Sequence, residues 1–61
     1  MVNEFEVACI ILEEDNPDVI RVGDGVTEAW LPRDKISIRK LENNLVEITM
    51  PNELAKESGF L

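Results

Sequence analysis

The chain has 61 residues, 44% of them apolar and 31% charged, which is typical of a folded globular domain rather than a disordered segment. A domain of this size buries only about 60% of the surface that its unfolded chain exposes, so we expect one thin core in a single domain over residues 1–61. Thirteen acidic residues against six basic ones give a net charge of −7, which disfavours direct binding to nucleic acid or to an anionic membrane.

The cysteine count and the hydropathy pattern favour a cytoplasmic location. The single cysteine, Cys9, excludes an intrachain disulfide, whereas secreted domains of this size normally carry several. The longest apolar run, residues 7–12, is far shorter than the roughly 20 residues of a membrane-spanning helix. No basic segment precedes an apolar run in the manner of a signal peptide.

The stretch FEVACIILE, residues 5–13, predicts the first strand. Phe5 and Val7 alternate with Glu4 and Glu6 before the run becomes continuously apolar, and such a run indicates a central strand that is covered on both faces. The following EEDNPD predicts a turn, because proline cannot donate to a strand ladder and Asn, Asp and Pro favour turns.

The stretch DVIRVGDGVTEAWL, residues 18–31, predicts a hairpin. Asp24 and Gly25 suit a two-residue type I′ turn, and this register pairs Arg21 with Glu28. The same register places four apolar side chains on one face: Ile20, Val22, Ala29 and Leu31.

Trp30, the only tryptophan, falls on the opposite face of that hairpin, and Pro32 ends the strand directly afterwards. We expect Trp30 to pack beneath the C-terminal helix, because a large aromatic side chain in a small domain is usually structural. The alternative is that Trp30 is an exposed residue of a binding interface.

The stretch KISIRKLENNLVEITM, residues 35–50, predicts a second hairpin. A three-residue loop at 42–44 is preferred to a two-residue turn, because it pairs Ile38 with Ile48 and Arg39 with Glu47. The last loop residue, an asparagine, is expected in the left-handed conformation, which asparagine tolerates.

The closing stretch PNELAKESGF predicts one short helix. Pro51 suits the first helical position, Gly59 suits the residue after the last turn, and Phe60 can fold back on Leu54 or Ala55. A helix of about two turns is not stable alone, so it should dock on the sheet. The expected fold class is α+β: a small antiparallel meander of about five strands with one short C-terminal helix.

The chain lacks the side chains that most catalytic and metal sites use. It has no histidine, no tyrosine and no pair of cysteines, which argues against zinc binding and histidine-based acid–base chemistry. EEDNPD lacks the glycine and the closing glutamate of an EF-hand loop, and Cys9 in an apolar strand is expected to be an inert hydrophobic residue. We therefore expect no enzyme activity, no cofactor and no metal site.

The charges are unevenly distributed along the chain. Residues 1–20 hold six acidic side chains and no basic one, whereas Arg33, Lys35, Arg39 and Lys40 lie close together in the sequence. For Arg39 and Lys40 we expect a solvated sheet face, with a phosphate-binding patch as the alternative. The acidic residues are the predicted partner-binding surface: Glu4, Glu6, Glu13, Glu14, Asp15, Asp18, Asp24 and Glu28.

EAWLPRDKI and VEITMPNELAKESGFL resemble a group of short uncharacterised phage and prophage proteins. The group has a Glu-x-Trp-Leu/Ile-Pro-Lys/Arg strand end and a closing helix with the pattern Met-Pro-x-x-Leu-Ala-x-Glu-x-Gly. This chain departs from the group where Asp34-Lys35 replaces the usual Ser-Gln and where Glu53 replaces a helix tryptophan. The resemblance implies a phage accessory protein in the host cell cytoplasm. The matching residues are Glu28, Trp30, Leu31, Pro32, Arg33, Met50, Pro51, Leu54, Ala55, Glu57 and Gly59.

In size and acidity the chain is also similar to small phage-encoded inhibitors, including anti-CRISPR proteins and DNA mimics. The leading hypothesis is therefore a protein that binds and inhibits a host nucleic-acid-binding protein, with carboxylates in place of phosphates. The alternative is an accessory or regulatory subunit of phage DNA metabolism that docks through Trp30, Pro32 and Arg33. In either case we expect a protein partner and a monomer or weak homodimer.

Overall fold

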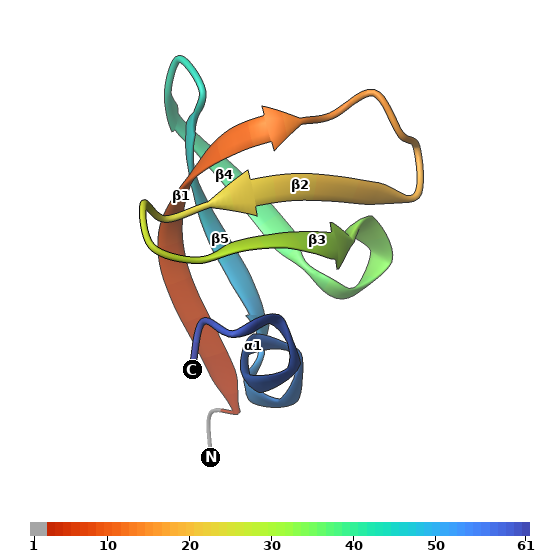
Figure 1. Ribbon diagram of the computed structural model, residues 1–61, viewed down its shortest axis with the longest axis vertical. Coiled ribbons are helices and arrows are strands. Elements are labelled where there is room, and N and C mark those ends of the chain that lie inside the picture. Colours follow the sequence, from red (N-terminus) through yellow and green to blue (C-terminus); the bar gives the residue numbers. More distant parts are fainter. Residues whose placement is uncertain (1–2) are drawn as a thin grey trace.

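The computed structural model describes residues 3–61, which form an antiparallel five-stranded sheet followed by one helix (Figure 1). This arrangement confirms the expected α+β class. The elements in chain order are β1 (Glu4–Glu13), β2 (Val19–Gly23), β3 (Glu28–Pro32), the 3₁₀ turn η1 (Arg33–Lys35), β4 (Ser37–Glu42), β5 (Leu45–Pro51) and α1 (Asn52–Ser58).

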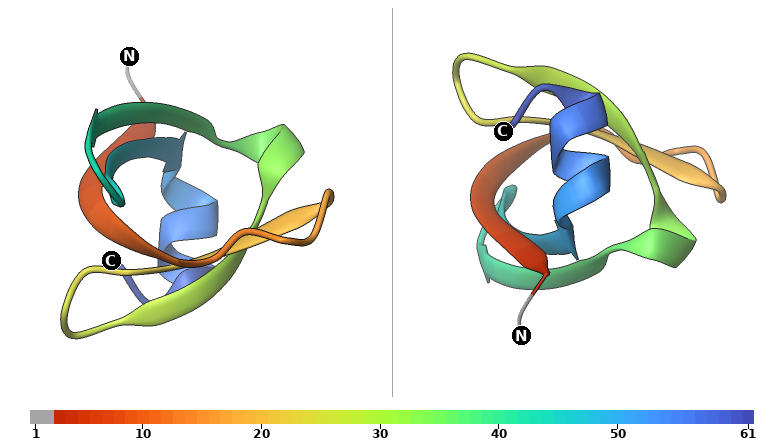
Figure 2. Two further views of the ribbon diagram at one scale, coloured as in Figure 1. Left: turned by 90° about the horizontal axis from the view of Figure 1, so that it is seen from above. Right: turned by 90° about the horizontal axis from the view of Figure 1, so that it is seen from below.

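The strand order in the sheet is β3-β2-β1-β5-β4, so the predicted sequential meander is wrong in one respect. β3 and β4 follow one another in the chain but form the two edges of the sheet, joined by η1. β1 is the longest strand and takes the centre, where its backbone is paired on both sides with β2 and β5. The sheet curls strongly, and α1 lies against its concave side (Figure 2).

The central position of β1 is confirmed, but its predicted burial on both faces is wrong. Cys9 is buried on the concave side, whereas Ile10 and Leu12 are 46% and 40% exposed on neighbouring positions. The reason is that residues 3–61 supply a single α-helix, and this helix covers only the concave side of the sheet.

The first hairpin has a longer loop than the sequence predicts. Gly23 pairs with Glu28, so the loop spans residues 24–27 and the register differs by two residues from the predicted one. The carboxylate of Asp24 explains the difference, because it accepts hydrogen bonds from the backbone N–H groups of Val26 and Thr27 at 2.9 and 2.7 Å. A shift of two residues leaves every side chain on its predicted face.

The second hairpin confirms the predicted pairs Ile38–Ile48 and Arg39–Glu47. The turn itself is shorter than predicted, because Glu42 pairs with Leu45 and only residues 43–44 remain in the loop. A bulge between Lys40 and Glu42 shifts the register by one residue, so that the predicted pairs still form farther from the turn. The left-handed residue is consequently Asn43, with φ of 47°, and not Asn44.

The helix ends as predicted and begins one residue later. Gly59 is left-handed with φ of 91°, and the backbone N–H of Phe60 donates to the carbonyl of Ala55 at 2.9 Å. Pro51 still belongs to β5 and precedes the first helical residue. Ala55 joins the core on the concave side, which consists of Cys9, Ile20, Val22, Leu31, Val46, Ile48, Met50 and Ala55.

Trp30 does not pack beneath the helix, so that prediction is wrong. Its neighbour Leu31 is completely buried, whereas Trp30 points to the convex side and remains 49% exposed. The predicted alternation of side chains along β3 is confirmed. The helix, however, lies on the side of Leu31 and not on the predicted side of Trp30.

We expect Leu31→Ala to lower the free energy of unfolding by about 2–5 kcal/mol, because it leaves a cavity in the core. Trp30→Ala should lower it by less and leave a cooperatively folded chain. Denaturant unfolding followed by circular dichroism measures both values. Loss of folding in Trp30→Ala alone would contradict the placement of this side chain.

Burial raises the pKa of the Cys9 thiol to about 11, and the carboxylate of Asp24 adds to the shift. A raised pKa favours the neutral thiol in the folded state, so this group destabilises the fold only as pH rises from about 9 towards 11. We expect iodoacetamide to leave Cys9 unmodified in the folded protein at pH near 8 and to modify it rapidly in denaturant. Equal rates in the two states would contradict this burial.

Candidate functional site

The convex side of the sheet carries exposed apolar side chains beside charged ones. Ile10, Leu12 and Trp30 are 46%, 40% and 49% exposed, and we call these three residues the outer-face patch. They come from β1 and β3, which both pair with β2. Exposed aromatic and aliphatic side chains that share one face are typical of protein-binding surfaces.

Gly23 lets the side chains of the patch lie close to the backbone of β2. A Cβ atom at this position would come within 3.3 Å of Leu12 Cδ1 and 3.2 Å of Glu28 Cγ. Because glycine has no side chain, Leu12 and Glu28 cover it from the convex side, and Gly23 is buried. The contact fixes Leu12 on the same face as Ile10, the cross-strand partner of Gly23.

An ion pair lies between the two halves of the outer-face patch. Arg21 stands directly opposite Trp30 in the ladder between β2 and β3, and its guanidinium contacts the carboxylate of Glu28 at 2.6 Å. The sequence predicted this charge pair at directly opposed positions, and the observed register makes it diagonal. Arginine and tryptophan are among the residue types that dominate protein interfaces.

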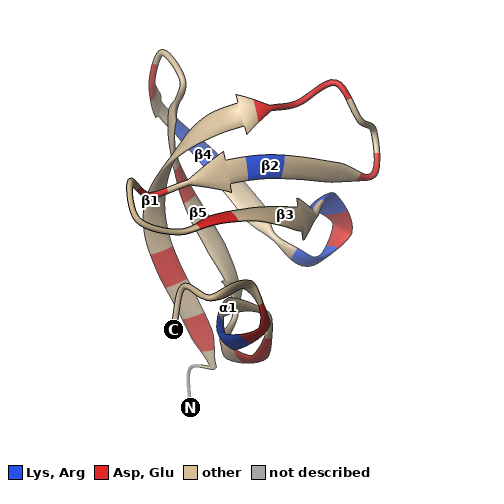
Figure 3. Ribbon diagram, viewed as in Figure 1, with Lys and Arg blue, Asp and Glu red and all other residues tan. Residues whose placement is uncertain are grey.

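The eight predicted acidic residues are all exposed, but they form three separate groups (Figure 3). Glu4 and Glu6 lie at the start of β1, and the largest group begins at its far end, roughly 20–30 Å away along the strand. That group consists of Glu13, Glu14, Asp15 and Asp18. The third group, Asp24 and Glu28, belongs to the first hairpin.

The connection between β1 and β2 is fixed by Arg33. Its guanidinium donates to the backbone carbonyls of Glu14 and Asn16 at 2.9 and 3.0 Å, and its backbone N–H donates to the carbonyl of Asp18 at 2.9 Å. The Asn16 side chain accepts from the N–H of Asp18 at 2.7 Å. Arg33 therefore holds the backbone of the acidic connection through these hydrogen bonds.

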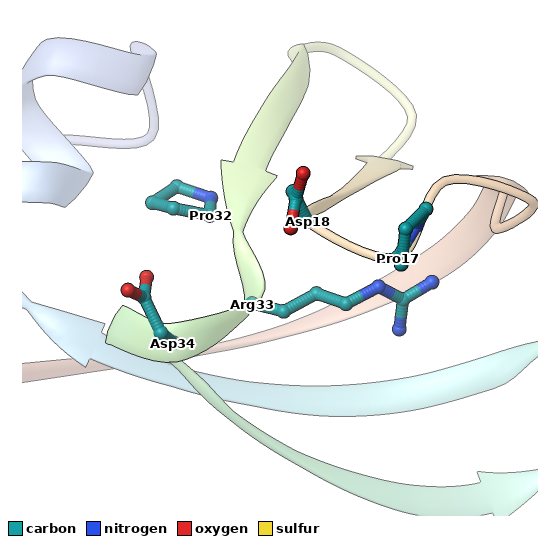
Figure 4. A pocket seen from close by; sticks show the side chains of 5 residues that line it. All are labelled: Pro17, Asp18, Pro32, Arg33 and Asp34. Atoms are coloured by element: carbon teal, nitrogen blue, oxygen red, sulfur yellow. The ribbon is translucent and has the colours of Figure 1, made fainter.

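Pro32 and Arg33, which the sequence placed with Trp30 in an alternative docking site, line a different feature. Together with Pro17, Asp18 and Asp34 they form a shallow groove of about 510 Å³ (Figure 4). Pro32 is half-buried, opposite Val19 in the ladder. Of the three predicted docking residues, only Trp30 belongs to the outer-face patch.

Asp24 has a structural role in the loop between β2 and β3. Hydrogen bonds from the N–H groups of Thr27 and Val26 lower the pKa of its carboxyl group, because they stabilise the charged form. The contribution of this carboxylate to stability is present at neutral pH and is lost as pH falls below its usual pKa of 3.8.

Ile10 and Leu12 are the site residues that the sequence reasoning missed. Their apolar run was interpreted as a doubly covered strand, although only one predicted helix was available to cover the sheet. The polar Arg21 and Glu28 on the same face of the neighbouring strands were the signal that this face meets solvent.

Within residues 3–61, no group of three acidic or cysteine side chains could hold a metal ion, and no helix is long and apolar enough to cross a membrane. Comparisons with protein-family models, curated proteins and solved structures found no match.

We expect Arg33→Met to release the connection between β1 and β2 without unfolding the sheet, because two hydrogen bonds from a charged donor are lost. Backbone amides of residues 14–18 should then exchange faster with deuterium. Arg33→Lys is the matched control, since one ammonium group cannot reach both carbonyls in the same way, and should restore only part of the protection. Unchanged exchange in Arg33→Met would contradict this role.

Proposed function

We propose that this chain is a non-enzymatic binding protein whose outer-face patch docks on a basic surface of another protein. The observation that carries the proposal is the 49% exposure of Trp30 on a sheet face with Ile10 and Leu12, in a chain of net charge −7. Apolar side chains provide the buried centre of such an interface, and charges at its rim steer and select the partner.

The acidic connection supports a basic partner. Glu13 lies opposite Arg21 in the ladder between β1 and β2, at the border of the patch. Glu14, Asp15 and Asp18 follow on the segment that Arg33 fixes. A fixed backbone lowers the entropy cost of binding, because the carboxylates are already held near their bound positions. The distance to Glu4 and Glu6 argues for one local acidic border and against a continuous row of phosphate substitutes.

In the phage setting that the sequence resemblance suggests, we propose a nucleic-acid-handling protein of the host as the partner, and inhibition as the result. A basic surface that normally holds nucleic acid would suit both the charge and the apolar centre of this face. An accessory subunit of phage DNA metabolism could dock through the same patch, but its partner would keep its nucleic-acid binding.

The proposal can be tested by placing a photo-crosslinking residue at position 10 and, as a control, at position 56 on the helix, and then expressing each protein in host cells. We expect position 10 to capture one basic protein that position 56 does not capture. Binding of the purified partner can then be measured by calorimetry and by the fluorescence of Trp30, which should shift to the blue on burial.

With that partner, Trp30→Ser should weaken binding by about 30-fold or more, the effect of removing an interface hot spot of about 2 kcal/mol. Leu41→Ser is the matched control, because Leu41 is exposed to a similar degree, 45%, on β4. It should change affinity by less than about twofold. Equal losses in the two variants would contradict the outer-face patch as the docking site.

Neutralising Glu13, Glu14, Asp15 and Asp18 together should slow association and reduce its dependence on salt between ~0.1 and ~1 M, because screening then has fewer charges to act on. Competition with nucleic acid separates the two roles. An inhibitor prevents the partner from binding nucleic acid, whereas an accessory subunit forms a three-component complex.

A further inference from the structure

The free edge of β4 is distinct from the outer-face patch and lies at the other side of the sheet. Among residues 3–61, β4 pairs only with β5, and all six residues of β4 are exposed. The opposite edge, β3, is better protected, because α1 packs against β3 and Pro32 ends the strand. An exposed edge strand presents unpaired N–H and C=O groups that a further strand can pair with.

The buried core ends at β5, and the apolar residue next to it on β4 is exposed. Val7, Ile48 and Ile38 lie opposite one another across β1, β5 and β4, and so form one row of concave-side residues. Ile48 is completely buried, whereas Ile38, the last residue of the row, is 39% exposed. A strand added next to β4 would cover Ile38 if it placed an apolar side chain opposite it.

The charge of this edge limits what can bind there. β4 carries Arg39, whose side chain is 71% exposed, and Lys40, and Lys35 precedes the strand. These basic residues outnumber the one acidic residue of the strand, Glu42. Arg39 contacts Glu47 of β5 at 2.9 Å, on the side away from the free edge. Two β4 edges brought together would place these positive charges against each other, which disfavours a second copy as the occupant.

We propose that the free edge of β4 binds an extended peptide segment of a partner protein in which apolar and acidic residues alternate. The peptide backbone pairs with β4, an apolar side chain covers Ile38 on the concave side, and a carboxylate faces Arg39 on the convex side, where Arg39 lies opposite Glu47. This is strand addition to a sheet edge, in which the backbone supplies affinity and alternate side chains supply selectivity. The inference does not depend on the function proposed for the outer-face patch.

The test uses the synthetic peptide acetyl-Val-Glu-Val-Glu-Val-Glu-amide with the full-length protein, followed by amide chemical shifts and deuterium exchange. We expect saturable shifts and slower exchange confined to residues 37–42 and their neighbours on η1. A peptide with Lys in place of each Glu should not bind, and neither should the acidic peptide with alternate backbone nitrogens methylated. Binding of either control peptide would overturn the proposal.

Arg39→Glu should weaken binding of the acidic peptide by about fivefold or more, since it exchanges attraction for repulsion at the edge. Lys56→Glu makes the same charge change on α1 and should alter affinity by less than about twofold. Trp30→Ser should bind the peptide normally. The proposal is wrong if β4 shows no shift up to the solubility of the peptide, if the shifts centre on β3, or if protection of β4 rises with protein concentration in the absence of peptide.

Discussion

One helix can cover one side of a sheet, and the rest of this structure depends on that limit. α1 closes the concave side, where Ile20, Leu31, Ile48 and Met50 belong to one buried core cluster with Ala55. The convex side has no covering element among residues 3–61, and its apolar side chains meet solvent. A chain of this length can therefore be stable and still present a large aromatic side chain on its surface, because the core and Trp30 lie on opposite faces of the same strands.

Charge is organised around that division. The two ion pairs among the described residues, Arg21–Glu28 and Arg39–Glu47, lie on the convex side and leave most carboxylates unneutralised. Arg33 could have formed a third pair but donates to backbone carbonyls instead. The result is an acidic surface whose longest loop has a defined shape.

The features that follow from local chemistry could be predicted from the sequence. Alternation along β2 and β3 assigned every side chain to its correct face, and the glycine after the helix correctly marked its end. The length of the first hairpin loop was missed because the Asp24 carboxylate, rather than the backbone alone, completes the turn. Which face of β1 is covered could not be predicted from the local sequence, because it depends on where the C-terminal helix docks. For the same reason Trp30 was recognised as notable but assigned to the wrong environment.

The ladder between β1 and β5 unites the first and last strands of the chain, from Glu4 opposite Pro51 to Ile10 opposite Leu45. The two hairpins close through short loops and can form quickly, but this central ladder must close a loop that spans most of the chain. During synthesis β1 leaves the ribosome before β2, β3 and β4, and its partner β5 follows after them. The apolar run of β1 must then stay soluble without one of its two neighbours until β5 has emerged, and the acidic residues on both sides of that run disfavour association with other chains.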